Sequence, residues 1–187
     1  MVVCRAAGTG RRGTAMKNER EIQAGQEPGA SSEGENRELE KKARLRCMKL
    51  LEYSDRTEQQ LCRRLKEGGF PPFAIESAID YVKQMHYLDD RRFAENYVLQ
   101  QGEKKSRRRI AQDLLQKGVD AELIEAALGD DWHQEEETAA KLLEKHVRGR
   151  DLTDEKTRWS LIRYLTGRGF SYDLSKRLVE EYVSREE

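Results

Sequence analysis

A run of basic residues near the middle of the chain is its best candidate for a binding site. The run comprises Lys104, Lys105, Arg107, Arg108 and Arg109. A helix is expected to begin at Ser106, because serine is a good N-terminal cap and Ile110 and Leu114 follow at helical spacing. The three arginines then occupy its first turn, at the positive end of the helix dipole, where acidic residues would be more stable. Free backbone amides and guanidinium groups together suit a phosphate or carboxylate ligand.

The expected helix also predicts which way these side chains point. Arg109 points away from the apolar face formed by Ile110 and Leu114. Arg108 lies at the edge of that face and Arg107 at its mouth. A charge run is equally typical of a plain solvated helix face, and both interpretations stay open. Related helices carry further cations that would extend a cationic track, namely Arg63, Arg64, Lys156 and Arg158.

Enzymatic chemistry finds little support in the sequence. The three histidines are scattered, and none pairs with a cysteine or a second histidine at the spacing of a metal site. There is no Walker-type loop, no Gly-x-Gly-x-x-Gly and no nucleophile elbow. Asp89 and Asp90 are better explained as a helix cap and a first-turn acid than as a catalytic pair. We therefore predict that the protein is not an enzyme and uses no cofactor or metal.

A threefold repeat surrounds the basic cluster. Each copy has a capping Thr or Ser, apolar residues 4 and 8 positions later, then Gly and an apolar residue at positions 12 and 13. The copies are Thr57, Leu61, Leu65, Gly69 and Phe70; Ser106, Ile110, Leu114, Gly118 and Val119; and Thr157, Leu161, Leu165, Gly169 and Phe170. The glycines lie about 50 residues apart, a spacing typical of repeat architectures. Each copy predicts a helix with a cap at its start and a glycine in the left-handed conformation at its end. The apolar residue after the glycine is expected to fold back onto the apolar face of that helix.

Further helical patterns precede and follow each of these helices. The following sets are Ile75, Ala78 and Ile79; Ile124, Ala127 and Leu128; and Leu174, Leu178 and Val179. Before the first copy, residues 37–53 carry an apolar set of Ala43, Leu45, Met48, Leu50 and Leu51. Trp132 and Trp159 lie in similar patterns, which favours packing in the core or between repeats over base stacking. No segment alternates with period two for long enough to be a strand, so the fold is predicted to be all-α.

The composition favours several small units over one deep core, with 37% charged and 36% hydrophobic residues among 187. We expect three tandem three-helix repeats in an elongated, curved array, at residues 41–87, 88–130 and 131–187. Residues 1–40 are rich in Gly, Ser, Glu and Arg and are predicted to be a disordered tail. Because the net charge is zero, any attraction to a polyanion must be local.

The cellular setting follows from cysteine usage and hydropathy. The three cysteines have no paired or metal-like spacing, which fits a reducing compartment. No apolar run approaches the ~20 residues of a membrane span, and the basic N-terminal segment lacks the apolar core of a signal peptide. We expect a soluble, cytoplasmic protein with no membrane partner.

Four motifs within the repeats form a recognisable pattern. They are Tyr53-Ser-Asp-Arg-Thr57 with Leu61, Leu65 and Gly69-Phe70; Tyr87-Leu-Asp-Asp-Arg-Arg-Phe-Ala-Glu-Asn-Tyr97; Arg109-Ile110 with Leu114 and Lys117-Gly118-Val119; and Tyr164-Leu-Thr-Gly-Arg-Gly-Phe170. Together they resemble the RecX regulatory proteins, from about residue 40 to the end of the chain. The block Tyr-Leu-Asp-Asp-x-x-Phe-Ala is a fairly specific part of this resemblance.

The resemblance implies tandem three-helix units and a monomeric modulator of the RecA recombinase, acting in recombination, DNA repair and the SOS response. Family members bind RecA filaments on single-stranded DNA, lie along the helical groove, and inhibit ATP hydrolysis and strand exchange. Many also bind DNA weakly, so single-stranded and double-stranded DNA are both expected partners. The family has no catalytic residues. Lys104 and Lys105 replace glycines common before the basic helix, which is expected to raise affinity for DNA, and the N-terminal tail lies outside the pattern.

Two functions therefore compete. One is an interaction protein that binds a recombinase filament and blocks its cycle. The other is a general helix-turn-helix-like DNA-binding module without a recombinase partner, which places Arg107, Arg108 and Arg109 on phosphates. Binding dominated by phosphate contacts is expected to weaken steeply as salt rises, which separates the two.

Overall fold

The computed structural model describes residues 30–129, 135–148, 150 and 152–186. These residues form helices and no strand, so the predicted all-α fold is confirmed. The helices are α1 (Ala30–Tyr53), α2 (Glu58–Glu67), α3 (Pro72–Gln84), α4 (Asp90–Gln101), α5 (Arg107–Gln116), α6 (Ala121–Leu128), α7 (Glu135–Val147), α8 (Glu155–Gly167) and α9 (Tyr172–Glu186).

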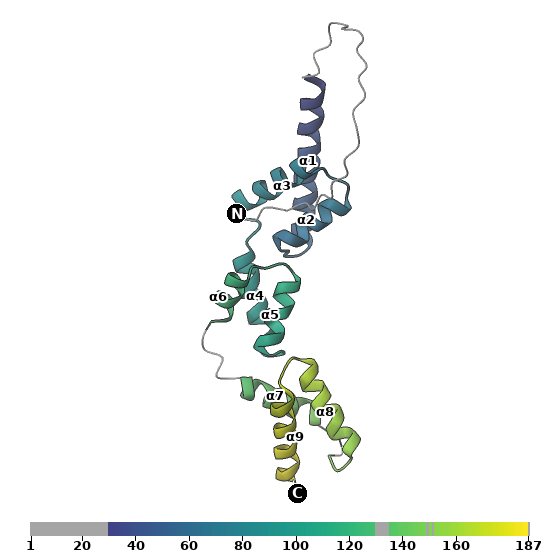
Figure 1. Cartoon of the computed structure of the whole chain (residues 1–187), viewed down its shortest axis with the longest axis vertical. Coiled ribbons are helices and arrows are strands. Elements are labelled where there is room, and N and C mark those ends of the chain that lie inside the picture. Colours follow the sequence, from purple (N-terminus) through teal and green to yellow (C-terminus); the bar gives the residue numbers. More distant parts are fainter. Residues whose placement is uncertain (1–29, 130–134, 149, 151, 187) are drawn as a thin grey trace, which may run out of the picture.

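The helices group into three repeats, α1–α3, α4–α6 and α7–α9, that follow one another along a curved, elongated array (Figure 1). Wherever two helices pack extensively, both belong to one repeat. Each repeat also encloses its own apolar core, and none of the three clusters of buried residues extends into a second repeat. The centres of the cores are Leu61 and Leu65, Ile110 and Leu114, and Leu161 and Leu165, all fully buried.

The predicted caps and glycines form the ends of the second helix in the first two repeats. The hydroxyls of Thr57 and Ser106 each accept a hydrogen bond from the backbone N–H three residues later. Gly69, Gly118 and Gly169 have φ angles of 77°, 84° and 94°, the left-handed region that ends a helix at low cost for glycine. The apolar residues after these glycines pack back onto the cores, as predicted for Phe70, Val119 and Phe170.

The third repeat departs from the predicted cap. α8 begins at Glu155, and the cap is Asp154, whose carboxylate accepts from the N–H of Lys156 at 3.2 Å. Thr157 lies inside the first turn and donates its hydroxyl to Asp154 at 3.2 Å. The prediction of Thr157 as the cap was therefore wrong. Its counterpart in the middle repeat, Ser106, is buried against the following repeat, whereas the structure describes no repeat beyond α9.

Two apolar residues that were predicted to pack are exposed. Leu45 is 55% exposed, and Cys47, one turn after Ala43, is buried in the first core instead. Trp159 is 48% exposed, so its predicted packing role was wrong. Trp132 lies outside the described residues.

The first helix is longer than its apolar pattern indicated. α1 begins at Ala30, seven residues before the expected start at Arg37, and residues 32–38 are exposed. This part of the helix relies on its own backbone bonds and on spaced ion pairs such as Glu38 with Lys42. Residues 1–29 of the predicted tail lie outside the described residues. Among the helices that are described, none is long and apolar enough to cross a membrane.

Candidate anion-binding surface

The basic cluster lies where the second repeat meets the third. Ser106 is fully buried, and its Oγ accepts a hydrogen bond from the N–H of Arg109 at 3.2 Å. The N–H of Ser106 donates to the carbonyl of Arg168, in the third repeat, at 3.0 Å. The start of α5 therefore faces another repeat. Some of the amides that were predicted to be free for a ligand are used within the protein.

Two cations of the cluster share a carboxylate that the sequence analysis missed. Asp113 is only 9% exposed, and its Oδ2 accepts from Lys105 Nζ at 2.6 Å and from the Tyr97 hydroxyl at 3.1 Å. Its Oδ1 lies 3.3 Å from Arg109 Nε. The spacing of four between Arg109 and Asp113 is a sequence signal for that pair. Nothing in the sequence indicated Lys105, because it reaches Asp113 from outside the helix.

The charges in this group reinforce one another. Burial by itself would raise the pKa of Asp113, but hydrogen bonds from Lys105 and Tyr97, with the charges of Lys105 and Arg109, lower it overall. The hydrogen bond to Asp113 raises the pKa of Lys105 against the effect of burial. Burial, more than any other cause, raises the pKa of Tyr97. At neutral pH the group is therefore a carboxylate, an ammonium and a neutral phenol.

Arg107 contacts the end of a neighbouring helix. Its Nη1 donates to the carbonyl of Gly129, just after α6, and its Nη2 lies 3.0 Å from Glu125 Oε2. A cation at a helix C-terminus is favourable, because carbonyl groups there have no partner within the helix. The arginine that seemed misplaced at the start of α5 thus stabilises the end of α6.

Lys104 and Arg108 are the cations of the cluster that have no partner among the described residues. Both are exposed, and in the part of the chain that the structure describes neither side chain has an ion pair or hydrogen bond. Within the described residues their charges are therefore not neutralised, unlike those of Lys105, Arg107 and Arg109.

The flanking cations also differ in whether other residues pair with them. Arg63 and Arg64 both bind Glu67, each at 3.0 Å, and hydrogen bonds from Arg63 and Arg64 lower the pKa of that carboxyl. Arg158 Nε donates to the carbonyl of Leu152 at 2.7 Å and so fixes the connection before α8.

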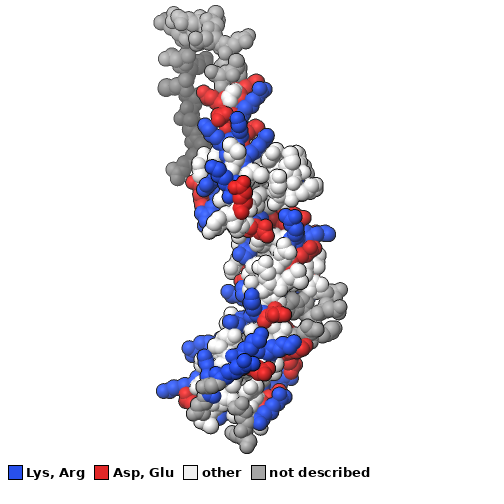
Figure 2. All heavy atoms as spheres, turned by 180° about the vertical axis from the view of Figure 1, so that it is seen from behind, with Lys and Arg blue, Asp and Glu red and all other residues white. Residues whose placement is uncertain are grey.

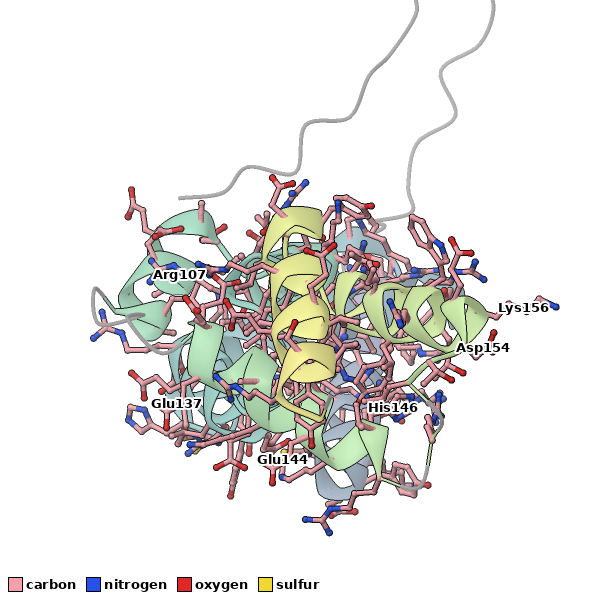
Figure 3. All side chains as sticks on the ribbon, turned by 90° about the horizontal axis from the view of Figure 1, so that it is seen from below. Arg107, Glu137, Glu144, His146, Asp154 and Lys156 are labelled. Carbon is pink, nitrogen blue, oxygen red and sulfur yellow. The ribbon has the colours of Figure 1, made fainter. Side chains whose placement is uncertain are left out.

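Lys156 is exposed, and its amine has no partner within the described residues. Seen along the array, Lys156 and Arg107 lie on opposite sides of the molecule (Figure 3). On the face in Figure 2, basic side chains extend over the third repeat at the lower end, with acidic ones among them. Arg107 and Lys156 therefore do not share one side of the array.

The exposed face of α8 adds an aromatic residue that was assigned to the core. Lys156, Trp159 and Arg163 are spaced three and four residues apart and are all exposed, so they share one face of the helix. The indole Nε1 of Trp159 donates to Glu155 at 3.4 Å. This combination of cations and a flat aromatic ring suits a nucleic-acid strand.

A stack of three side chains lies beside the same helix. The His146 ring is parallel to the Tyr164 ring at 3.8 Å, and the Arg168 guanidinium lies 4.0 Å from the centre of that ring. At these distances the two groups must occupy opposite faces of Tyr164. Burial lowers the pKa of His146, and the charges of Arg150 and Arg168 add to this, so His146 is neutral at pH 7. The described residues contain no cluster of metal-ligating side chains.

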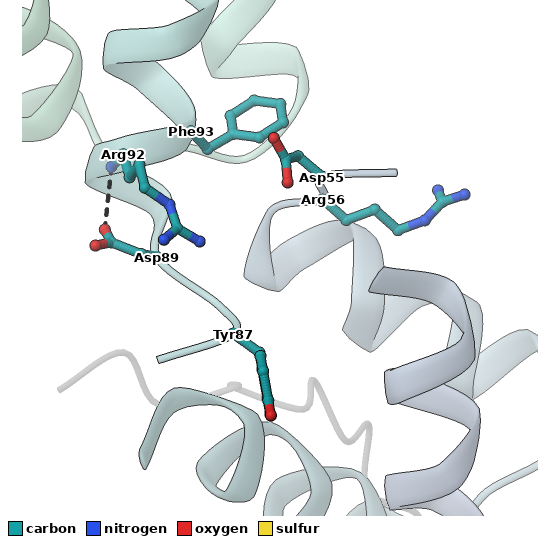
Figure 4. Close-up of a pocket in the computed structure, with 6 residues that line it drawn as sticks. All are labelled: Asp55, Arg56, Tyr87, Asp89, Arg92 and Phe93. Carbon is teal, nitrogen blue, oxygen red and sulfur yellow. Dashed lines mark hydrogen bonds between the residues drawn. The ribbon is translucent and has the colours of Figure 1, made fainter. Parts of the chain in front are cut away.

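The contact between the first two repeats contains a shallow cleft (Figure 4), lined by Asp55, Arg56, Tyr87, Asp89, Arg92 and Phe93. Asp89 accepts from the N–H of Arg92 at 3.0 Å, which confirms it as the cap of α4. Asp90 accepts from the N–H of Glu58 in α2 at 3.0 Å, and burial raises the pKa of Asp90. Its carboxylate therefore links two repeats in addition to its place in the first turn of α4.

Comparison with known proteins places this architecture in a family. The models of the first, second and third three-helix domains of RecX match residues 43–81, 89–128 and 134–179. The chain belongs to the RecX family. It is 33% identical over 149 residues to regulatory protein RecX of Clostridium botulinum (strain Alaska E43 / Type E3), covering 78% of this chain and 70% of that protein. It is 35% identical over 165 residues to regulatory protein RecX of Thermobifida fusca (strain YX), covering 85% and 87%.

Solved structures agree with this assignment. A crystal structure of regulatory protein RecX superposes with a TM-score of 0.68 at 25% identity, over 83% of this chain and 80% of that one. RecX from Lactobacillus salivarius shares the fold, with a TM-score of 0.60 at 22% identity, over 77% of this chain and 96% of that one. The exact repeat boundaries expected at residues 41, 88 and 131 stay predictions.

Proposed function

We propose that this protein binds RecA filaments on single-stranded DNA and inhibits their ATP hydrolysis and strand exchange. The observation that carries the proposal is membership of a family of regulatory proteins through all three of its three-helix domains. The elongated array supports it, because a series of small units offers a long surface for a groove between protein subunits and a nucleic-acid backbone.

Lys104 and Arg108 are the residues we propose for contact with the filament. Both belong to the middle repeat, and their charges are not neutralised within the described part of the chain. Lys105, Arg107 and Arg109 support the fold through Asp113, Glu125 and the end of α6, so substitutions there would confuse stability with binding.

The test is ATP hydrolysis by RecA preassembled on single-stranded DNA, with this protein titrated in. A binding curve on DNA alone is measured at the same salt. We expect inhibition at concentrations too low to coat bare DNA. If the protein does not inhibit hydrolysis, or inhibits it only at concentrations that saturate free DNA, a filament partner is refuted.

Charge reversal then tests the proposed contact. Lys104→Glu with Arg108→Glu is expected to raise the half-inhibitory concentration about tenfold, because two attractive contacts become repulsive. Arg46→Glu with Lys49→Glu is the matched control, since these exposed cations of α1 also lack partners among the described residues. Equal inhibition by the two double variants would exclude Lys104 and Arg108 from the contact.

A general DNA-binding function is the second candidate, favoured by the exposed face of Lys156, Trp159 and Arg163. Base stacking on Trp159 would quench its fluorescence, and Trp159→Phe would remove that signal. If this function dominates, binding to bare DNA weakens steeply with salt and RecA adds no specificity. Quenching that is the same with and without Trp159 would exclude this face.

A further inference from the structure

The repeats of this array meet at the ends of helices. Their apolar cores are separate, and the helix pairs that pack extensively lie within one repeat. Their relative placement must therefore depend on the few polar and close contacts between neighbouring repeats and on the chain that connects them.

The first contact joins the start of α2 to the end of α5. Thr57 is fully buried, and its hydroxyl donates to the carbonyl of Lys117 at 2.5 Å while it accepts from the N–H of Gln60. Next to it, Gln59 lies against Gly118, so closely that a Cβ on this glycine would be 2.4 Å from the Cβ of Gln59.

The second contact has the same design one repeat later. Ser106, the counterpart of Thr57, is fully buried, and its N–H donates to the carbonyl of Arg168 at 3.0 Å. A Cβ on Gly169 would lie 2.4 Å from Ser106 Oγ and 2.6 Å from the Cβ of Arg109. Lys117 and Arg168 each precede the left-handed glycine, so both contacts use the same position of the repeat.

The equivalent positions at the two ends of the array lack these contacts. Gly69 has the same left-handed backbone, but no preceding repeat is described and a Cβ there would meet no atom within 4 Å. Thr157 has no following repeat in the described structure, and it is neither buried nor a cap. In the part of the chain that the structure describes, close packing at the cap and the glycine thus occurs only where two repeats meet.

We propose that these contacts are joints that set the curvature of the array, with Gly118 and Gly169 as their positioning residues. The cap of one repeat docks on the glycine turn of the next. Each glycine therefore has two separate roles: its left-handed φ closes a helix, and its missing side chain admits the neighbouring repeat. The inference concerns the shape of the free protein and does not depend on a RecA partner.

The expected perturbation follows from the distances. Carbon atoms in contact lie about 3.5–4.0 Å apart, so alanine at position 118 needs about 1 Å more room against Gln59. The neighbouring repeat must rotate or shift to provide it, and this displacement grows with distance from the joint. Gly69→Ala is the matched control, because it adds the same strain at positive φ without a contact across repeats.

The experiment measures distances between repeats in the full chain. Nitroxide labels are attached through an unnatural amino acid at exposed positions, which leaves the native cysteines unlabelled. One pair, Glu76 with Glu122, spans the first joint, and a second pair, Glu122 with Lys176, spans the second joint. Distance distributions come from pulsed electron paramagnetic resonance, and helix content from circular dichroism.

We expect Gly118→Ala to shift or broaden only the distribution across the first joint, and Gly169→Ala only that across the second. Gly69→Ala should change neither. Unchanged distributions in the first two variants, or an equal change in the control, would overturn the proposal. Should Gly118→Ala also lose helix content, the double variant Gly118→Ala with Gln59→Gly decides, since it removes the clashing side chain. Recovery of the helix content in the double variant supports the proposed joint, and failure to recover it refutes the proposal.

Discussion

Asp113→Asn tests whether the shared carboxylate of the middle repeat stabilises the fold. The substitution keeps the shape of the side chain but removes the charge that faces Lys105 and Arg109. Lys105 is the more affected partner, because its side chain is 28% exposed and its Nζ lies 2.6 Å from the carboxylate. The side chain of Arg109 is 44% exposed, so water screens its charge.

The magnitude follows from these exposures. A hydrogen bond to a charged group contributes about 1.5–3 kcal/mol, and a partly exposed pair at helical spacing adds about 0.3–0.5 kcal/mol. Asparagine can still accept a hydrogen bond, and removing an acid near the end of α5 gains about 0.3 kcal/mol or more. We therefore expect Asp113→Asn to destabilise the middle repeat by about 2 kcal/mol at pH 7.

The loss must also depend on pH. The pKa of Asp113 is lowered in the folded chain, so its contribution is complete above its ordinary value of 3.8 and disappears as pH falls through the folded pKa. The pKa of Lys105 is raised, so its part is complete below 10.5 and is lost as pH rises through the folded pKa. The difference between variant and wild type is expected to be largest from about pH 5 to 9.

The assay is native-state hydrogen exchange of α4 and α5, read by mass spectrometry, with urea unfolding measured in parallel. Exchange resolves one repeat, whereas the unfolding of an array need not be two-state. Variant and wild type are compared at each pH. Asp80→Asn is the control, because this exposed carboxylate of α3 has no partner among the described residues. Equal protection of α5 in Asp113→Asn and wild type at pH 7, or a deficit that persists unchanged to pH 3, would refute the reasoning.

Three further predictions concern single side chains. Arg107→Ala is expected to cost about 1 kcal/mol in urea unfolding, because it removes the guanidinium from the Gly129 carbonyl and Glu125 at the end of α6, whereas Lys104→Ala should stay within about 0.5 kcal/mol; equal costs would contradict the assigned contacts. Leu45→Ser is expected to be nearly neutral by the same assay and Leu61→Ala to cost about 2–5 kcal/mol, because only Leu61 is buried; a large loss at Leu45 would place it in a core. Burial, and then the nearby Cys62, raises the pKa of Cys47 to about 11, so iodoacetamide at pH 8 should leave Cys47 unmodified in the folded chain but not in urea; rapid labelling of the native protein would contradict its burial.

Local signals in the sequence predicted the helices and their repetition. A capping residue, apolar residues four apart and a closing glycine are short-range features, so Thr57, Ser106, Gly69, Gly118 and Gly169 could be assigned without tertiary information. Where local signals compete, the assignment failed. Asp154 and Thr157 can both cap a helix, and the repeat pattern predicted Thr157 where the structure has Asp154.

The status of Lys105 and Arg107 could not be predicted, because their charge partners lie in other elements. The sequence determined that five cations gather at the start of α5. Only the tertiary structure decided that Asp113 holds Lys105 and that the end of α6 holds Arg107. It also decided that Lys104 and Arg108 have no partner among the described residues. Likewise, the apolar pattern around Trp159 could not show that this side chain is 48% exposed.

The sequence by itself therefore determined the helical units and their threefold repetition, because period, caps and glycines act within a few residues. The tertiary structure alone decided how the units join and which charges are free. Which charges are paired depends on partners in another element, such as Asp113 for Lys105 and Glu125 for Arg107. How the units join depends on contacts between residues about 60 positions apart, such as Thr57 with Lys117 and Ser106 with Arg168. No pattern within one helix encodes such a contact, since it exists only once neighbouring repeats have docked.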